Sequence, residues 1–340
     1  MLFRSFSSAS WYQGTADAVR KNLTHLQNTD FDYALILSGD QLYRMDFREI
    51  IAQHLETGAD VTIAAIPFPV SKVAGLGLMQ VNDDLSVGRF VEKPKDPAVL
   101  DSLQIPRESY DDLDIEGSED FYLASMGIYV FNRSTMVKLL DNDFTDFGKH
   151  IIPGAISSHR VFSYVYQGYW EDIGTIKSFF EANLDGAEEL PKFNFFDMSS
   201  PIYTRPRFLP GSKINGASID HAIVSDGCII SHAHVSHSVI GVRSFVGIGT
   251  NLHRVIMMGA DYYESQASMH ENLNAGRPRM GIGQHCRIEN TILDKNVRVG
   301  DNCVISPAGK PENFDGNGYV IRDGIVIVPK NGVIPHGTVI

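Results

Sequence analysis

The pattern of hydrophobic and polar positions changes partway along the chain. From Trp11 to about Leu190, segments with helical spacing alternate with short apolar runs that are typical of buried strands. The spacing predicts helices over 15–26 and 47–55, and strands over 34–37, 61–66 and 127–131. Helices that alternate with strands are typical of an α/β domain with a mainly parallel sheet, which we expect for the first half.

In the second half, apolar positions recur every five or six residues, separated by small and polar ones. Hexapeptide spacing of this kind predicts a parallel β-helix in which each coil places one aliphatic side chain inside. We expect the inward positions to be Ile219, Val224, Ile230, Val235, Ile240, Val246 and Leu252, followed by Ile282, Ile288, Leu293, Val299 and Ile305. The polar stretch 261–279 is interpreted as an excursion from the coil.

A linker separates the two halves. Prolines 201, 206 and 210 punctuate it, and the helical and strand-like periodicity stops near Phe193. We therefore expect a first domain over 1–192, a linker over 193–212 and a β-helix domain over 213–340. The first helix is expected to begin with Thr15 as its N-cap and Asp17 in its first turn.

Composition narrows the class of protein. The chain has 29 Lys and Arg residues against 41 Asp and Glu residues, a net charge of −12, which argues against nonspecific binding to nucleic acid or anionic membranes. No apolar stretch is long enough to span a bilayer. Because Cys228, Cys286 and Cys303 form no metal-like cluster, we expect reduced, buried thiols in a cytosol-like compartment.

The first ten residues are Ser-rich, with Arg4 and no acidic residue, and superficially look like a transit sequence. They are few for that purpose and lead directly into what looks like domain interior at Trp11. We interpret them as a fragment boundary or a misassigned start.

Two carboxylates are candidates for a metal site. The apolar run 35–37 stops at Ser-Gly-Asp, with Asp40 at its end, and ligands of open α/β sheets gather at the carboxyl ends of strands. Asp172, between an aromatic pair and a Gly turn, could complete a Mg²⁺ site, since one or two carboxylates commonly hold that ion. Alternatively, Asp40 is a solvated turn residue, and Asp172 or Thr175 caps the next helix.

Residues that could bind a sugar phosphate are spread along the first half. Lys93 ends a strand-like stretch, where it could neutralise a phosphate or form a surface ion pair with Glu92. Tyr12 and Ser125 can hydrogen-bond hydroxyls or phosphate, and Gly77 would let a sugar approach the backbone. The simpler alternatives are a half-buried core aromatic for Tyr12 and an ordinary turn glycine for Gly77.

Five motifs in this order resemble those of the ADP-glucose pyrophosphorylases (glucose-1-phosphate adenylyltransferases). They are WYQGTADAV at 11–19, SGD at 38–40, FVEKP at 90–94, SMGIYVF at 125–131 and YWEDIGT at 169–175. The resemblance implies a Rossmann-like nucleotidyltransferase domain followed by a left-handed parallel β-helix. It also implies that ATP and glucose-1-phosphate give ADP-glucose and pyrophosphate, for glycogen or starch synthesis.

The resemblance assigns roles to individual residues. Asp40 and Asp172 would hold Mg²⁺, and Lys93 would align the nucleophile. The expected glucose-1-phosphate ligands are Tyr12, Gly77, Glu92, Lys93 and Ser125. Residues expected on the nucleotide side are Gly14, Thr15 and Asp17, the last two of which fit equally well as a helix cap and a first-turn acid. Lys295 and Lys330 match the positions where relatives bind a phosphorylated activator, often 3-phosphoglycerate, or are simply solvated lysines.

Members of this family are tetramers and act in the cytoplasm, or in the plastid stroma of plants. They open with a glycine-rich loop of the G-G-G-x-G-T-R-L type upstream of the position of Trp11, and this chain shows no such loop. Loops of that kind cradle nucleotide phosphates. We therefore expect an N-terminally truncated first domain without its first strand, and little or no pyrophosphorylase activity of this chain alone.

Two other functions are compatible with parts of the sequence. The chain could be a non-catalytic regulatory or structural subunit of the same enzyme. Less favoured is a hexapeptide-repeat acyltransferase, which would recruit one of several histidines and would leave the five motifs unexplained. Those histidines are His221, His232, His234, His237 and His253.

Overall fold

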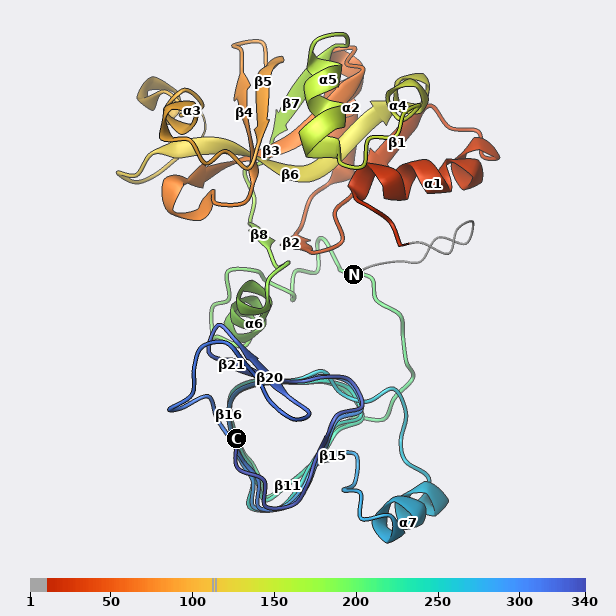
Figure 1. The fold of residues 1–340 in the computed structure, drawn as a ribbon, viewed down its shortest axis with the longest axis vertical. Helices are drawn as coiled ribbons and strands as arrows, with labels where there is room; N and C mark the ends of the chain where they lie inside the picture. The colour runs from red at the N-terminus through yellow and green to blue at the C-terminus, as the bar shows by residue number, and fades with distance from the viewer. Residues whose placement is uncertain (1–10, 112, 114) are drawn as a thin grey trace. The chain divides into compact units, whose positions relative to one another are not determined.

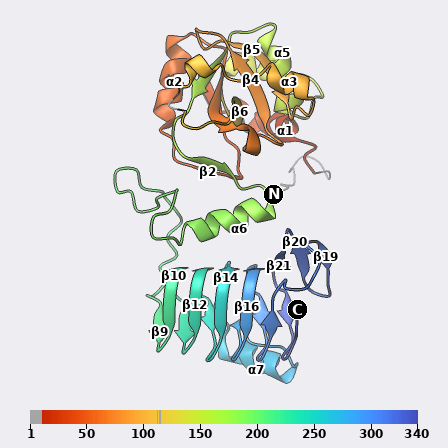
Figure 2. The ribbon, with the colours of Figure 1, turned by 90° about the vertical axis from the view of Figure 1, so that its left-hand side faces the viewer.

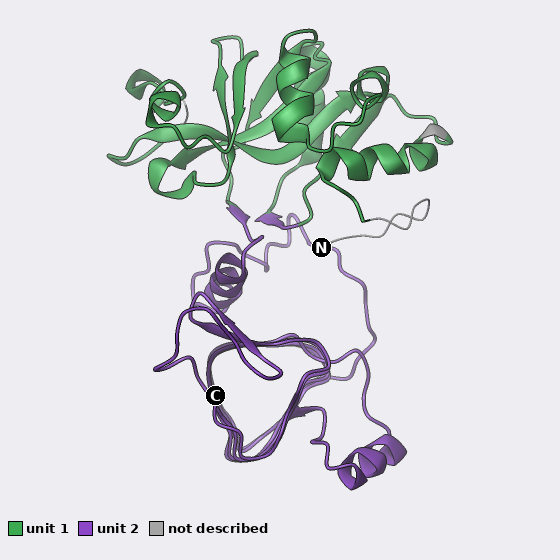
Figure 3. Cartoon of the chain, in the orientation of Figure 1, with its two compact units in different colours: residues 1–39, 43–170 green, residues 40–42, 171–340 purple. Residues whose placement is uncertain are grey.

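The structure is a computed structural model that describes residues 11–111, 113 and 115–340. The interpretation of the first ten residues therefore lies outside the described residues. Two compact units make up the chain, residues 1–39 with 43–170 and residues 40–42 with 171–340 (Figure 3). This division falls earlier than the expected domain boundary at residue 192, which stays a prediction.

A six-stranded sheet forms the centre of unit 1 (Figure 1). Its order is β5-β4-β6-β3-β7, and β1 pairs with β6 beside that path. The predicted strands are confirmed, although two of them are longer than expected. The strands are β1 (Tyr33–Ile36), β3 (Val61–Pro69), β4 (Gly77–Val81), β5 (Val87–Glu92), β6 (Phe121–Asn132) and β7 (Val161–Val165).

Strand directions in this sheet differ from the expectation of mainly parallel pairing. β3 and β7 run parallel, whereas β1, β3 and β4 all pair antiparallel with β6, and β4 pairs antiparallel with β5. Strands buried on both faces have continuous apolar sequences whichever way their neighbours run. The apolar runs therefore predicted the strands and the α/β class, but they contained no signal for direction.

Both faces of the sheet are covered by hydrophobic side chains. Ile63 and Phe131 belong to one buried cluster, whereas Ala64 and Val130, their chain neighbours, belong to another. Such alternation follows from the two-residue period of a strand. The helices of this unit are α1 (Thr15–Gln27), α2 (Phe47–Glu56), α3 (Pro97–Asp101), α4 (Arg133–Leu139) and α5 (Ile152–Ile156), with short turns η1 (Val70–Lys72), η2 (Arg107–Ser109) and the π-helix η3 (Phe147–Ile151).

Unit 2 contains the predicted parallel β-helix, whose strands stack coil on coil (Figure 2). Helix α6 (Ile176–Asp185) packs on it, because Phe180 and Leu184 share a buried cluster with Ile256 and Ile292. The strands are β9 (Lys213–Asn215), β10 (Ser218–Val224), β11 (Ile229–Ser231), β12 (His234–Ile240), β13 (Phe245–Val246), β14 (Asn251–Met257), β15 (Gly281–Ile282), β16 (Arg287–Leu293), β17 (Arg298–Val299), β18 (Val304–Ile305), β19 (Phe314–Asp315), β20 (Val320–Arg322), β21 (Ile325–Val328) and β22 (Val333–Ile334).

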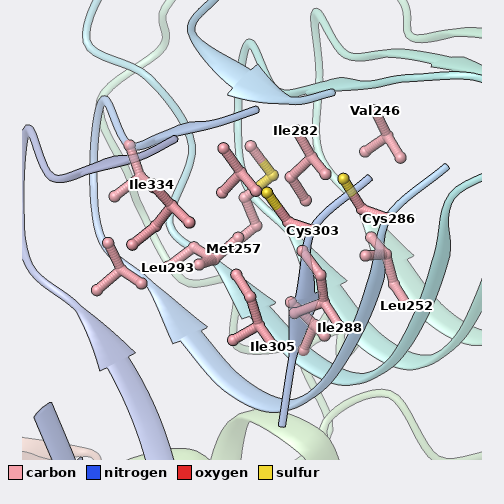
Figure 4. Close-up of a cluster of buried hydrophobic side chains, with 14 of the residues drawn as sticks. Val246, Leu252, Met257, Ile282, Cys286, Ile288, Leu293, Cys303, Ile305 and Ile334 are labelled. Carbon is pink, nitrogen blue, oxygen red and sulfur yellow. The ribbon is translucent and has the colours of Figure 1, made fainter. Parts of the chain in front are cut away.

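The aliphatic side chains of the coils stack in columns inside the β-helix (Figure 4). One column follows the pairing Ile219, Val235, Leu252, Ile288 and Ile305. The predicted inward residues from Ile230 to Ile305 are buried, and Ile219 and Val224 in the first coil are partly buried against the same core. All three cysteines are buried free thiols, as expected.

Several residues of the coils adopt left-handed backbone conformations. His221 and His237 each have φ of 46°, and Arg254 and Asn290 at equivalent positions have 54° and 46°. His232, at another position of the coil, also has φ of 46°. Only glycine adopts this region without strain, and Asn tolerates it better than most residues. His221 and His237 are therefore left-handed positions within β10 and β12, and His232 lies between β11 and β12, so these three histidines have a backbone role in the coil.

Two segments leave the coil. The predicted excursion over 261–279 is confirmed and contains α7 (Gln266–Asn274) (Figure 1). A second excursion, not separated in the sequence interpretation, forms the antiparallel hairpin of β19 and β20 before the chain returns at β21. Between Asp185 and Lys213 the chain has no helix or strand. None of the helices in the described parts of the chain has the length and apolar character of a membrane span.

Candidate functional site

Asp40 and Asp172 converge on one glycine. Asp40 immediately precedes β2 (Gln41–Tyr43), and Asp172 is the last residue of β8 (Trp170–Asp172), which pairs with β2. The N–H of Ile173 donates to the carbonyl oxygen of Asp40 at 3.0 Å. A Cβ atom at Gly174 would lie 3.0 Å from Asp172 Oδ1 and 3.1 Å from Asp40 Oδ2. The structure thus brings the two predicted metal ligands together, and a glycine keeps the space between them open.

The alternative role of Asp172 as a helix cap does not hold. Thr175 caps α6, since its hydroxyl accepts from the N–H of Ser178 at 3.1 Å, while Asp172 Oδ1 accepts from the N–H of Gly174 at 2.8 Å. Both carboxylates are exposed. Two exposed carboxylates suit Mg²⁺, which takes one or two of them and fills its other positions with water and phosphate oxygens.

No group of three or more His, Cys, Asp or Glu side chains in the described ranges is arranged to hold a metal ion. A site built only from protein ligands, as for structural zinc, is therefore not seen there. The pair Asp40 and Asp172 would need further oxygen ligands from solvent or substrate.

In unit 1, the carboxylate of Glu92 fits against two glycines. Glu92 ends β5 opposite Gly77, which begins β4. A Cβ atom at Gly77 would lie 2.7 Å from Glu92 Oε2, and one at Gly148 would lie 2.8 Å from the Glu92 carboxyl carbon. Burial, reinforced by the negative charge of Asp146, raises the pKa of Glu92, and Lys93 and Lys149 only partly oppose the shift.

Lys93 follows Glu92 in a left-handed conformation, with φ of 51°. Its N–H donates to the carbonyl of Leu76 at 3.1 Å, so the backbone is fixed where the strand ends. The side chain is 56% exposed, and Nζ lies 3.9 Å from Glu92 Oε1. That separation makes a weak surface ion pair, which leaves the ammonium group available to an anionic ligand.

Ser125 lies where β6 bulges. The register of β3 against β6 shifts between Ile63 and Ala65, and Gly127 in the bulge has φ of 66°. Ser125 Oγ accepts from the N–H of Gly127 at 3.2 Å. Burial raises the pKa of Tyr129 to about 12, and a hydrogen bond with Ser125 acts in the opposite direction. Bulges redirect side chains and are frequent next to functional sites.

The segment 145–148 contacts Glu92 through Gly148 and the start of α1 through Thr145. The sequence interpretation did not identify this segment. The carbonyl oxygen of Thr145 accepts from the N–H groups of Ala16 and Asp17 at 2.9 and 3.2 Å. A Cβ atom at Gly14 would lie 3.0 Å from the carbonyl carbon of Thr145, so a glycine permits this approach. Gly148 meets Glu92 through a contact between distant parts of the chain, for which the sequence offered no local signal.

The prediction that Thr15 is the N-cap of α1 was wrong. Gly14 occupies that position, and the Thr15 hydroxyl accepts instead from the N–H of Phe147 at 3.2 Å. The reason is tertiary: a carbonyl from a distant segment satisfies the first N–H groups of the helix, so no side-chain cap is needed.

Asp17 is buried and engaged by residues of α1 and of the segment just before it. It accepts from the N–H of Gln13 at 2.9 Å and pairs with Arg20 and Lys21 at 2.9 and 2.8 Å. Burial acts to raise the pKa of Asp17, but these bonds outweigh it and hold the pKa below its usual range. The nucleotide-side role of Gly14, Thr15 and Asp17 stays a prediction, and local contacts already account for all three.

Tyr12 is half-buried beside α1. Its hydroxyl accepts from Asn22 Nδ2 at 2.9 Å, and Lys21 Nζ lies 5.9 Å from the centre of its ring. The phenol therefore has one local partner and a cation above it. Its role as a ligand for glucose-1-phosphate stays a prediction.

Lys295 and Lys330 meet at one carboxylate. Lys295 Nζ lies 3.2 Å from Asp261 Oδ1, and Lys330 Nζ lies 2.8 Å from Asp261 Oδ2. Asn296 Nδ2 donates to Asp261 Oδ2 at 3.1 Å. Hydrogen bonds from Lys330, Asn296 and Lys295 hold the pKa of Asp261 well below its usual range. The structure thus brings the two predicted activator lysines together and adds an acidic partner that the sequence interpretation did not identify.

Comparison with protein families matches both units. Residues 5–189 match the family model described as nucleotidyl transferase, and residues 207–339 match the GLGC left-handed parallel beta-helix domain. The two matches follow the order that the motifs and the hexapeptide spacing predicted. Nucleotidyl transferases generally use a divalent metal, which agrees with the chemistry of Asp40 and Asp172.

A curated relative covers nearly the whole chain. It is the glucose-1-phosphate adenylyltransferase small subunit, chloroplastic/amyloplastic, of Triticum aestivum, with 41% identity over 344 residues, 99% of this chain and 72% of the relative. An identity of this size over almost the full chain extends the resemblance well beyond the five short motifs. It favours the nucleotidyltransferase interpretation over the acyltransferase one.

Proposed function

The chain belongs to the nucleotidyl transferase family, with a GLGC left-handed parallel β-helix as its second domain, and from this premise we propose that it acts as a glucose-1-phosphate adenylyltransferase. The reaction would join ATP and glucose-1-phosphate to give ADP-glucose and pyrophosphate, for glycogen or starch synthesis. The relative from wheat carries this activity in its name.

The convergence of Asp40 and Asp172 on Gly174 is the observation that carries the proposal. Nucleotidyl transfer needs a cation on the triphosphate, and the donor set of two exposed carboxylates suits Mg²⁺. When bound, Mg²⁺ would neutralise phosphate charge and orient the leaving pyrophosphate. Gly174 contributes by leaving the two carboxylates an open space.

The sugar phosphate would be bound by residues of unit 1. Lys93 would neutralise the phosphate whose oxygen attacks the α-phosphorus of ATP. Glu92, fitted against Gly77 and Gly148, would accept hydrogen bonds from sugar hydroxyls. Ser125 and Tyr12 would supply further polar contacts. These groups position and neutralise the reactants, which is the main protein contribution to phosphoryl-type transfer.

We also propose a mode of regulation and an oligomeric state from the family resemblance. We propose Lys295 and Lys330 as ligands for a phosphorylated activator, supported by their convergence on Asp261. From the resemblance we propose that the chain forms a homo- or hetero-tetramer. The wheat relative is named as a small subunit, which agrees with assembly from more than one chain. That relative is named chloroplastic/amyloplastic, so the plastid stroma is proposed for a plant chain and the cytoplasm otherwise.

Binding of glucose-1-phosphate, measured by isothermal titration calorimetry, tests the sugar site without requiring turnover. Lys93→Ala removes a charge-assisted contact and is expected to weaken binding by about tenfold or more. Lys95→Ala, an exposed lysine close by in the chain, is the matched control and should leave the affinity unchanged. Equal affinities for the parent chain and Lys93→Ala would refute the sugar site.

Binding of Mn²⁺, followed by electron paramagnetic resonance, tests the carboxylate pair independently. Asp172→Asn should weaken Mn²⁺ binding, whereas Asp83→Asn, an exposed aspartate in a turn of unit 1, should not. Pyrophosphate release with ATP, Mg²⁺ and glucose-1-phosphate then identifies the role of the chain. Turnover identifies a catalytic subunit, whereas binding without turnover agrees with the low activity expected of this chain alone and with the non-catalytic alternative.

A further inference from the structure

A small pocket opens between the excursion that carries α7 and the outer face of the β-helix. Its lining includes Arg243, Ser244, Phe245, Tyr262, Tyr263 and Arg279, and its volume is about 120 Å³. Pockets for drug-sized ligands hold about 300–1,000 Å³, so this one suits a single small group. Asp261, Lys295 and Lys330 are not among its lining residues.

Two guanidinium groups at this pocket are held by neutral partners. The Arg279 guanidinium lies over the ring of Phe245, with Cζ 3.9 Å from the ring centre. A guanidinium over an aromatic face is attracted by the ring, and its N–H groups remain able to donate hydrogen bonds. Arg243 donates through Nη1 to the carbonyl of Ala260 at 3.1 Å, and its Cζ lies 5.9 Å from the ring of Tyr263.

The charge of these arginines is not balanced locally. Glu264 also lines the pocket, but its Oε1 lies 2.7 Å from Arg298 Nη1, and its Oε2 accepts from the N–H of Met280 at 2.8 Å. Within the described part of the chain, no carboxylate lies within the 4.0 Å ion-pair distance of Arg243 or Arg279. The pocket therefore carries local positive charge from Arg243 and Arg279, although the net charge of the chain is −12.

Aromatic hydroxyls complete the lining. Tyr263 donates to the carbonyl of Gly227 at 2.9 Å, which holds its ring against the coil, while Tyr262 is 53% exposed. A tyrosine hydroxyl can donate to an anion while its ring excludes water from one side. The lining thus combines two arginines with the hydroxyl of Tyr262 as a further donor, since that of Tyr263 is already used on Gly227.

We propose that this pocket binds a phosphate group, either as inorganic phosphate or as the phosphate of a small ester. Guanidinium groups match phosphate oxygens with paired N–H donors, and such charge-assisted bonds are stronger than neutral ones. The volume admits the phosphate group and leaves any attached organic part outside. It would be an anion site additional to the sugar site and to the proposed activator lysines.

Calorimetric titration of the full chain with inorganic phosphate tests the proposal. The chain should carry Lys93→Ala, Lys295→Ala and Lys330→Ala, which silence the other anion sites named above. Saturable binding is expected, and Arg279→Gln should weaken it by about tenfold or more. Arg279→Lys, which keeps the charge and loses the paired donors, should recover only part of the affinity.

Arg277→Gln is the matched control, because Arg277 is exposed on the same loop and does not line the pocket. It should leave phosphate affinity unchanged. Parallel titration with glycerol 3-phosphate distinguishes the sources: tighter binding of the ester indicates a small organic phosphate, and equal or weaker binding indicates inorganic phosphate. Absence of saturable binding by both, or equal losses in Arg277→Gln and Arg279→Gln, would overturn the proposal.

Discussion

Glu92 is positioned by the glycines around it more than by its neighbour Lys93. The ion pair with Lys93 spans 3.9 Å and involves a side chain that is 56% exposed, so it contributes little. Gly77 and Gly148, in contrast, leave room for the carboxylate only because they lack Cβ atoms. The partly buried charge of Glu92 is therefore retained at a cost to stability, which is common for residues that bind a ligand.

Replacing Glu92 should change stability in a pH-dependent way. Because burial raises its pKa above the ordinary 4.5, ionised Glu92 destabilises the folded state at neutral pH, and this cost disappears as the pH falls below the ordinary value. Glu92→Gln should therefore have a higher midpoint of thermal unfolding than the parent at about pH 7, and an equal one at about pH 4.

The same Glu92→Gln variant should bind glucose-1-phosphate more weakly, by about tenfold, because an amide is a poorer acceptor than a carboxylate. Thermal unfolding followed by circular dichroism, together with calorimetry, checks both effects. Glu108→Gln, an exposed glutamate of η2, should show neither. A lower unfolding midpoint of Glu92→Gln at neutral pH would contradict this account of the site.

Some site residues could be identified from the sequence, and others could not. Glu92 and Asp172 were identified because short motifs surround them, whereas Gly77 lies outside those motifs and was assigned by the resemblance. The structure places Gly77 against the Glu92 carboxylate. Gly148 was not identified, since its significance depends on a contact with a strand more than fifty residues earlier. Thr15 was assigned as a cap on local grounds, and a carbonyl from Thr145 replaced it.

Elements were predicted best where periodicity alone defines them. The hexapeptide spacing identified the inward columns of the β-helix, because every coil repeats the same three-sided geometry. The directions of β1, β3 and β4 relative to β6 were not predictable, since an apolar run is equally consistent with both pairings. The relative direction of two paired strands depends on how the intervening chain connects them, and hydrophobic periodicity contains no information about that connection.

Asp261, Lys295 and Lys330 come from three separate segments of the β-helix region and meet in one cluster. This arrangement predicts how the charge of Asp261 affects the binding of an anion. Asp261 holds the ammonium groups of Lys295 and Lys330, so an anionic ligand of these lysines must compete with it. Asp261→Asn should therefore bind 3-phosphoglycerate roughly twofold to fivefold more tightly, in line with the strength of exposed ion pairs. Calorimetry at low and high salt checks this, because screening reduces the difference.

Asp220→Asn is a suitable control for this effect, since Asp220 is an exposed aspartate on β10 that pairs with His221. Its removal changes the net charge by the same amount without touching either lysine. If Asp261→Asn bound the anion more weakly than the parent, Asp261 would be part of the binding site rather than a competitor.

The whole chain has separate hydrophobic cores in its two units. Each buried cluster of the described residues draws its members from one unit only, and α6 shares its cluster with the β-helix. The sequence predicted two domains from the change in periodicity. It did not show that α6 packs with the coils, because an amphipathic helix does not specify which surface its apolar face contacts.

Separate cores predict two unfolding transitions that can be changed independently. Ile288 is fully buried in the β-helix, so Ile288→Ala should destabilise unit 2 by about 2–5 kcal/mol, the usual cost of such a cavity. Both tryptophans of the chain, Trp11 and Trp170, belong to unit 1. Tryptophan fluorescence should therefore report unit 1, whereas far-ultraviolet circular dichroism reports both units.

In a denaturant titration, Ile288→Ala should move only the unit 2 part of the circular dichroism signal to lower denaturant and leave the fluorescence transition in place. Ile63→Ala, a matched change in the core of unit 1, should shift the fluorescence transition together with the part of the circular dichroism signal that comes from unit 1. Equal shifts of both signals in Ile288→Ala would show that the units unfold as one cooperative block. Independent transitions would mean that the sugar-phosphate residues of unit 1 and the activator lysines of unit 2 belong to separately stabilised folds.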